Sequence, residues 1–272
     1  MMTHKAISSR SNVQVALIVI IGFFVSRKFI PPVLRKIMGG IEAGVATLWQ
    51  DLTIRIIVMI LVPALITALI VGRKNVLQIW GFDKAPWRGL GFAALCMLPL
   101  PLVYAFSFPL SDMSTVFMRL LHGAVIPGTT EEIWFRCFLF GLLFRVANWG
   151  FLPAAILGAI IFGAAHLYQG NAVLDSVGVF AITGAASLWW AWIYVEWDYN
   201  PWVPIGFHVL MNGCFVVFTV SDTALLPIVG EVARASVVII SVGLTLWIRQ
   251  RQGGRKITGR LWIKPPPPEI VS

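Results

Sequence analysis

Residues 131–146 read EEIWFRCFLFGLLFRV, an apolar run that opens with two glutamates and carries an arginine one turn later. Two other apolar runs also hold polar side chains, His166 in one and His208 with Asn212 in the other. Ionisable groups are costly at membrane depth, so their presence there points to a functional site. Most other charges lie at the ends of apolar runs or between them. The three clusters therefore predict chemistry inside a membrane.

The composition supports this class of protein. Of 272 residues, 58% are hydrophobic and 12% are charged, and the mean hydropathy is +0.84. Soluble domains carry about 25% charged residues. Apolar segments that cross lipid must be helical, because a helix satisfies its own backbone polar groups. We therefore predict an all-α, polytopic membrane helical bundle of about eight transmembrane helices, at residues 13–25 with extensions, 54–71, 90–106, 131–146, 151–168, 173–195, 202–220 and 224–248.

The net charge of +9 reflects membrane orientation rather than nucleic-acid binding. Basic residues flank the apolar segments, and no basic stripe interleaved with aromatics is present. With eight spans, thirteen Lys and Arg lie on the side of the two termini and seven on the other. The bias predicts cytoplasmic N and C termini. The short loops and small size fit a prokaryotic plasma membrane, with the lipid bilayer and no nucleic acid as partner.

The chain is expected to form one membrane domain. Residues 1–12 form a short N-terminal segment, residues 13–248 the helical domain, and residues 249–272 a basic, Pro-rich disordered tail with four consecutive prolines. Residues 29–50, interrupted by Pro31-Pro32 and Gly39-Gly40, are predicted to form an interfacial stretch. Five tryptophans around Glu196 and Asp198 predict an aromatic belt at the membrane boundary, namely Trp189, Trp190, Trp192, Trp197 and Trp202.

Helical spacing assigns different directions to the first polar cluster. Glu132 and Arg136 are i and i+4 and can pair, whereas Glu131 points about 100° away from Glu132. An unpaired Glu131 facing a cavity suits a general base. A structural alternative is a capping box, with Thr129 as N-cap and Glu132 at N3.

The two histidine clusters repeat the same spacing. Phe162 and His166 are i and i+4, as are His208 and Asn212, so the last pair can place two hydrogen-bond donors at one point. The alternative for both is an ordinary interhelical polar contact. By the predicted topology His208 enters the membrane from the side opposite Glu131. The two can meet only if His208 lies well inside its span.

Taken together, the three clusters resemble the CAAX-protease and bacteriocin-processing family of intramembrane proteases, which includes Rce1-type prenyl-protein endopeptidases. The family pattern of Glu-Glu-x-x-x-Arg, Phe-x-x-x-His and His-x-x-x-Asn is intact and in order, within a motif core at residues 129–213. The three matching motifs are Glu131-Glu132-Ile-Trp-Phe-Arg136, Phe162-Gly-Ala-Ala-His166 and His208-Val-Leu-Met-Asn212.

The resemblance implies hydrolysis of a peptide bond in a peptide or protein substrate, prenylated or membrane-anchored. Glu131 and His166 would activate a water, while His208 and Asn212 would stabilise the oxyanion. Glu132, Arg136 and Phe162 would support the site. This mechanism needs no cofactor. The alternative is a zinc metalloprotease with Glu131, His166 and His208 as ligands.

Two other functions stay open at this point. The first is a catalytically inactive membrane binding or immunity protein of the same fold. The second is a small proton-coupled transporter with the same ionisable groups as a relay. The intact motifs favour the protease over the binding protein, and the absence of paired, broken spans in two halves disfavours the transporter.

Overall fold

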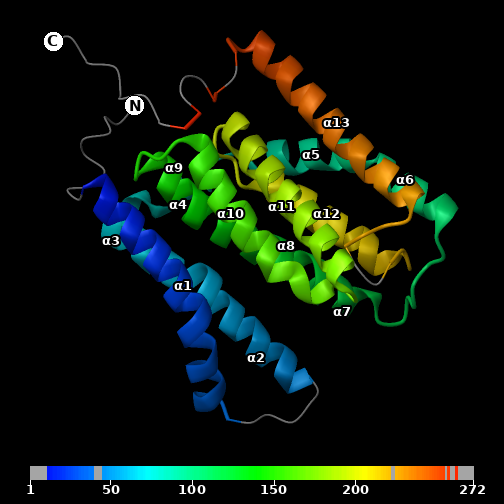
Figure 1. The fold of residues 1–272 in the computed structure, drawn as a ribbon, viewed down its shortest axis with the longest axis horizontal. Helices are drawn as coiled ribbons and strands as arrows, with labels where there is room; N and C mark the ends of the chain where they lie inside the picture. The colour runs from blue at the N-terminus through cyan, green and yellow to red at the C-terminus, as the bar shows by residue number, and fades with distance from the viewer. Residues whose placement is uncertain (1–10, 40–44, 222–223, 255, 258–260, 263–272) are drawn as a thin grey trace. The chain divides into compact units, whose positions relative to one another are not determined.

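The computed structural model describes residues 11–39, 45–221, 224–254, 256–257 and 261–262. Within these residues the chain is helical and contains no β-strand, only isolated bridges such as the one that joins Leu110 and Phe218. Figure 1 shows the helices along the chain. The chain divides into two compact units, each described by itself below. One comprises residues 1–80, 133–154 and 258–272, and the other residues 81–132 and 155–257.

The prediction of a polytopic all-α membrane protein is confirmed. Among the described residues, six helical stretches are long and apolar enough to cross a membrane: Asn12–Ile37, Leu48–Val71, Pro86–Ser107, Phe151–Gln169, Val173–Glu196 and Ile228–Arg251. A shorter apolar helix covers Trp202–Val217. The remaining predicted segment, residues 131–146, is also helical, but it is divided between consecutive α and π segments. All eight apolar runs therefore form helices.

The first unit is built around α1 (Asn12–Ile37), which packs against α3 (Val62–Val71), α9 (Gly141–Arg145) and the π-helix η5 (Ile133–Phe140). Its other elements are α2 (Val45–Ile56), η2 (Ile57–Leu61), η3 (Arg73–Asn75) and α4 (Val76–Trp80). Ser11 begins α1 with a capping box. At the core the ring of Phe23, which is fully buried, stacks on Trp134 at a centroid distance of 4.0 Å.

The second unit surrounds α12 (Trp202–Val217). This helix packs against α5 (Pro86–Met97), α7 (Val116–Leu120), η4 (Leu121–Val125), α8 (Ile126–Glu132) and α11 (Val173–Glu196). The remaining elements are α6 (Pro99–Ser107), most of α10 (Phe151–His166), η6 (Leu167–Gln169) and α13 (Ile228–Arg251). Figure 1 shows α12 beside α11.

Small residues allow this close packing on α12. A Cβ on Gly128 of α8 would lie 2.9 Å from the backbone nitrogen of Val209, and one on Gly206 would lie 2.7 Å from the Cβ of Ala93 in α5. Both distances are shorter than ordinary van der Waals contact. The glycines therefore bring α8 and α5 within direct backbone reach of α12.

Two predicted boundaries are wrong. The break expected at Pro31-Pro32 is absent, because α1 continues through both prolines to Ile37. The tail boundary at residue 249 is too early, since α13 continues to Arg251 and Arg249 is buried. Arg249 is held by carboxylates from the end of α11, which a basic composition cannot reveal. The predicted N-terminal segment, apart from its last two residues, and the four prolines fall outside the described residues.

Candidate active site

The two glutamates lie inside a helix rather than at its start. The elements α7, η4 and α8 follow one another without a gap, so Thr129 occupies a position within α8. Its neighbour Thr130 donates its hydroxyl proton to the carbonyl of Ile126 at 2.8 Å, a bond within the helix. The predicted capping box is therefore wrong. Glu131 is half-buried and Glu132 is fully buried, so neither glutamate serves a helix terminus.

Glu132 contacts the histidine of α12. The Nδ1 atom of His208 lies 2.7 Å from Oε1 of Glu132, within hydrogen-bond distance. The two residues are 0% and 4% exposed, so water screens the contact little. The meeting predicted between Glu131 and His208 stays a prediction, but the structure shows a contact between the neighbouring Glu132 and His208. It occurs because His208 lies almost two turns into α12, beside α8.

Aromatic side chains fix both imidazoles. The ring of Trp190, from α11, stacks on His208 with centroids 4.5 Å apart and planes 23° apart. Phe162 contacts His166 at 4.4 Å and His208 at 6.2 Å, measured between ring centroids. The structure therefore brings His166, Phe162 and His208 to one place, as the sequence predicted, and adds Trp190 to them.

Backbone carbonyls orient the other two polar residues. Nδ1 of His166 lies 2.7 Å from the carbonyl oxygen of Phe162. Because a carbonyl only accepts, this nitrogen carries a proton, and a ring with a single proton would hold a lone pair on Nε2. Asn212 donates an Nδ2 hydrogen to the carbonyl of Gly123 at 3.2 Å. Gly123 belongs to the π-helix η4, and π-helical turns are frequent at functional sites.

Arg136 lies in the first unit, within η5, where it is 1% exposed. Its guanidinium carbon is 5.7 Å from the ring centroid of Phe135, at cation–π distance. Since Glu132 belongs to the second unit, the pairing predicted between Glu132 and Arg136 stays a prediction.

The donor set for a metal is incomplete in this conformation. Within the described ranges, no group of three or more His, Cys, Asp or Glu side chains is arranged to hold a metal ion. A structural zinc site needs four protein ligands and a catalytic site three with an open position. The zinc alternative stays a prediction, and no step below uses it.

Two site features were not predicted from the sequence. Trp190 and its neighbour Trp189 were assigned to an aromatic belt, yet they are 3% and 9% exposed. The belt interpretation is wrong for this pair, because both rings pack on α12, against His208 and Phe207. The carbonyl of Gly123 was also missed. The available sequence signal for Trp190 was its position on the helix that precedes the helix of His208.

The fold and this cluster define a polytopic helical membrane protein with a buried polar site. Comparison with known families gives a closer assignment. Residues 113–214 match the family model described as Type II CAAX prenyl endopeptidase Rce1-like, and this range contains all three motifs. The predicted resemblance to this family is therefore confirmed over this part of the chain, and it supports an intramembrane endopeptidase in general. Neither the curated proteins nor the solved structures that were searched gave a match.

Proposed function

We propose that the cluster around His208 is the catalytic site of this endopeptidase and that it hydrolyses a peptide bond with an activated water. The buried contact between Glu132 and His208 is the observation that carries the proposal. Withdrawing a carboxylate and an imidazole from water costs free energy, so their presence at a buried position points to a function. Asn212, one turn beyond His208 on α12, adds a second polar group on the same face.

The hydrogen-bond partner of each Nδ1 atom suggests a different role for His166 and for His208. The lone pair on Nε2 of His166 can accept a proton from water, so His166 and Glu131 are suited to hold and activate the attacking water. This preserves the roles that the family resemblance implies for both residues. Glu131 is half-buried, whereas its neighbour Glu132 is fully buried.

His208 can act as an oxyanion donor only if its Nε2 atom carries a hydrogen. With Nδ1–H donated to Glu132, a neutral ring would present a lone pair at Nε2 and could not donate there. The doubly protonated ring donates from both nitrogens, and the carboxylate of Glu132 balances its charge. We infer that this charged pair places an Nε2–H donor at the oxyanion. The second Nδ2 hydrogen of Asn212 supplies the other donor.

The proposal is tested by peptide cleavage with purified full-length protein in liposomes, read by mass spectrometry. The substrate panel includes a farnesylated CAAX peptide and its unprenylated form. We expect Glu131→Gln to abolish cleavage, while Glu231→Gln, a glutamate in the first turn of α13, leaves the rate within about twofold of wild type. Retained cleavage in Glu131→Gln would refute the proposed mechanism.

The same assay with an added chelator distinguishes the metal-free mechanism from the zinc mechanism, both of which the family resemblance allows. Cleavage that survives chelation supports the water activated by Glu131 and His166. Cleavage lost on chelation and restored by added zinc would replace it with the zinc alternative. If folded wild-type protein cleaves no member of the panel, the inactive binding protein of the same fold becomes the better account.

We further propose a prenylated substrate and cytoplasmic termini in a prokaryotic plasma membrane. The description of the matching family supports the first, and the excess of Lys and Arg on the side of the termini supports the second. A strong preference for the farnesylated peptide over its unprenylated form tests the substrate. Labelling of cysteines introduced near each terminus, from one side of sealed vesicles, tests the orientation.

A further inference from the structure

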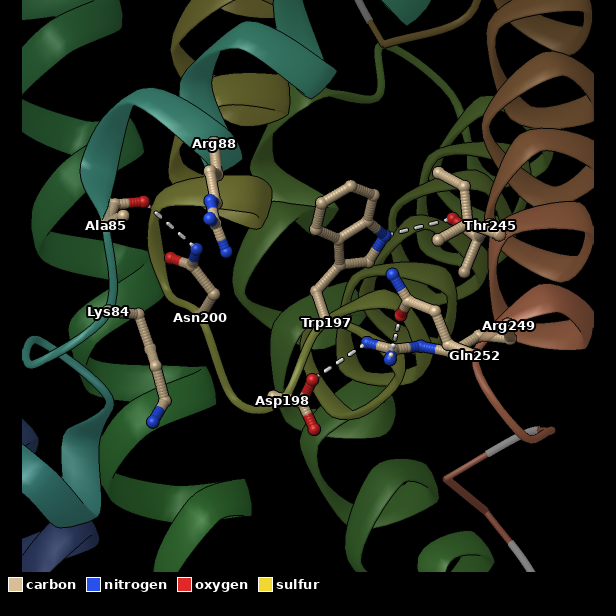
Figure 2. A pocket seen from close by; sticks show the side chains of 10 residues that line it. Lys84, Ala85, Arg88, Trp197, Asp198, Asn200, Thr245, Arg249 and Gln252 are labelled. Atoms are coloured by element: carbon tan, nitrogen blue, oxygen red, sulfur yellow. Dashed lines mark hydrogen bonds and ion pairs between the residues drawn. The ribbon is translucent and has the colours of Figure 1, made fainter.

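A polar cavity lies in the same unit as the proposed active site, at the ends of three membrane helices. Its volume is about 550 Å³, and it lies where α5 begins and where α11 and α13 end. Figure 2 shows its lining side chains. None of them belongs to the three protease motifs. The residues used below are Lys84, Arg88, Trp197, Asp198, Asn200 and Arg249.

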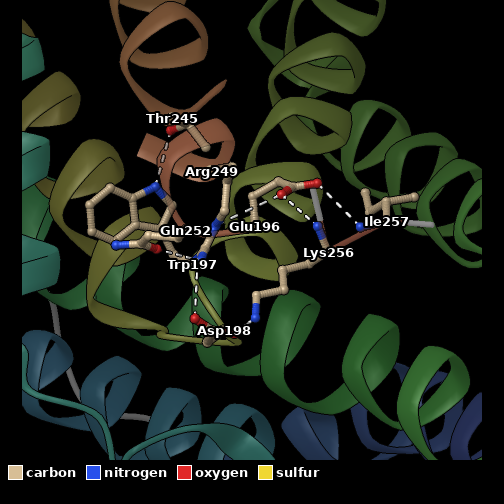
Figure 3. Close-up of polar contacts among 8 residues, drawn as sticks. All are labelled: Glu196, Trp197, Asp198, Thr245, Arg249, Gln252, Lys256 and Ile257. Carbon is tan, nitrogen blue, oxygen red and sulfur yellow. Dashed lines mark hydrogen bonds and ion pairs between the residues drawn. The ribbon is translucent and has the colours of Figure 1, made fainter. Parts of the chain in front are cut away.

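The charge of this cavity favours an anion. Three cationic side chains and one carboxylate line it, and one of the cations, Lys84, is paired at 3.0 Å with Asp83 outside the lining. The carboxylate of Asp198 is already held by two cations, Arg249 at 3.1 Å and Lys256 at 3.0 Å (Figure 3). Arg88 is exposed, and within the described part of the chain it has no hydrogen bond or ion pair. Its guanidinium, pointing toward Asn200 in Figure 2, is therefore available to a ligand.

The wall of the cavity is preformed by tight backbone contacts. Gly81 has φ of +82°, and a Cβ there would lie 1.7 Å from the carbonyl oxygen of Tyr199. Asp198 and Tyr199 adopt φ of 56° and 59°, a region that non-glycine residues rarely enter. Asn200 ties this turn to the start of α5 by donating to the carbonyl of Ala85 at 3.3 Å. Strained backbone held by its surroundings is often associated with binding sites.

The start of α5 adds to the positive potential. This helix begins at Pro86 without a side-chain cap, so the backbone N–H groups of its first turn remain available. Trp197 donates its indole N–H to the hydroxyl of Thr245 at 3.1 Å, which fixes its ring at the edge of the cavity. Tryptophan and cations at the ends of membrane helices are typical of the headgroup region. Basic pockets between such helices bind anionic lipid headgroups.

We propose that this cavity binds the phosphate of an anionic phospholipid headgroup. Arg88 contacts the phosphate oxygens, and Lys84, which is paired with Asp83, adds positive charge beside them. The first turn of α5 complements the charge of the phosphate, and Trp197 packs beside the headgroup. Arg249 stays paired with the acidic side chains of the turn and keeps the wall in place. The site is independent of peptide cleavage, so it stands whether or not the protease mechanism is correct.

The test measures retained lipid on full-length protein by native mass spectrometry. Protein in mixed micelles is titrated with phosphatidylglycerol or phosphatidylcholine, and with inorganic phosphate as competitor. We expect preferential retention of phosphatidylglycerol and an approximately tenfold weaker binding in the double variant Lys84→Gln, Arg88→Gln, the size expected for lost charge-assisted contacts. The matched control is Arg73→Gln with Lys74→Gln, which removes the same charge from the exposed helix η3.

Each outcome decides the proposal. Loss of phosphatidylglycerol preference in the cavity variant but not in the η3 variant supports it. Equal weakening in both variants would mean that general surface charge attracts the lipid, and would overturn it. Equal retention of the two lipids by wild type would also overturn it, as would full displacement of the lipid by millimolar inorganic phosphate, which would assign the cavity to the free ion. Unchanged thermal unfolding of both variants excludes misfolding as the cause.

Discussion

Replacing Glu132 with glutamine removes one charge from the site and little else. The variant keeps the side-chain length and an amide oxygen that can still accept from Nδ1 of His208, 2.7 Å away in wild type. It loses the negative charge that balances a doubly protonated ring. A singly protonated ring that donates its Nδ1–H to residue 132 has no hydrogen on Nε2 to donate. The substitution therefore separates geometry from charge at the proposed oxyanion donor.

The size of the effect follows from the loss of one oxyanion donor. Removal of such a donor lowers kcat by about 10²–10³, equivalent to about 2.7–4 kcal/mol of transition-state stabilisation. We expect Glu132→Gln to lower kcat by this factor with little change in KM, since the donor is used mainly in the transition state. Asn212→Ala is expected to fall in the same range, as it removes the second donor.

The assay is the initial rate of peptide cleavage at saturating substrate, with thermal unfolding measured in parallel. The two variants act on one oxyanion, so their double mutant should lose less than the product of the single losses. A folded Glu132→Gln protein whose kcat stays within about twofold of wild type would refute the charged-pair reasoning. A large rise in KM with unchanged kcat would refute it too, because that pattern indicates substrate binding.

Three further substitutions test the packing around the site. Trp190→Phe is expected to lower kcat about tenfold and to shift the pH–rate profile, because stacking on His208 is reduced, whereas Trp189→Phe, equally buried, should leave that profile unchanged. Gly128→Ala places a methyl group 2.9 Å from the backbone of α12 and should destabilise the protein by about 1–3 kcal/mol, seen as a lower Tm. Arg249→Met leaves a buried carboxylate without its cation and should cost about 3–5 kcal/mol in a denaturation experiment; an unchanged Tm in either variant would contradict the packing described.

The parts of the site that lie on one helix could be predicted from sequence. His208 and Asn212 are one turn apart on α12, so their common face follows from helical geometry alone. The same holds for Phe162 and His166, whose ring contact at 4.4 Å matches their i and i+4 spacing. Apolar composition was equally sufficient for the helical class, because lipid leaves few alternatives for the backbone.

Contacts between helices could not be predicted in the same way. Glu132 was paired in advance with a residue of its own helix, because periodicity describes neighbours along a single segment. Its contact with His208 depends on how closely α8 approaches α12, which Gly128 permits through tertiary packing. Trp190 was misassigned for a similar reason, since a tryptophan at a boundary and one against a buried imidazole look alike in composition.

The adjacency of the two glutamates now has a physical explanation. Both belong to α8, so their side chains point about 100° apart. Glu132 is fully buried against His208, whereas Glu131 is half-buried and points in another direction. In the proposed mechanism, one carboxylate balances the charge of an oxyanion donor while its neighbour acts on water. Moving either glutamate one turn along the helix would bring it back near its original face but about 6 Å away, beyond hydrogen-bond reach of its partner. Two consecutive glutamates therefore place carboxylates in two directions from one helical turn. This accounts for two adjacent ionisable residues inside the membrane, where even one is costly.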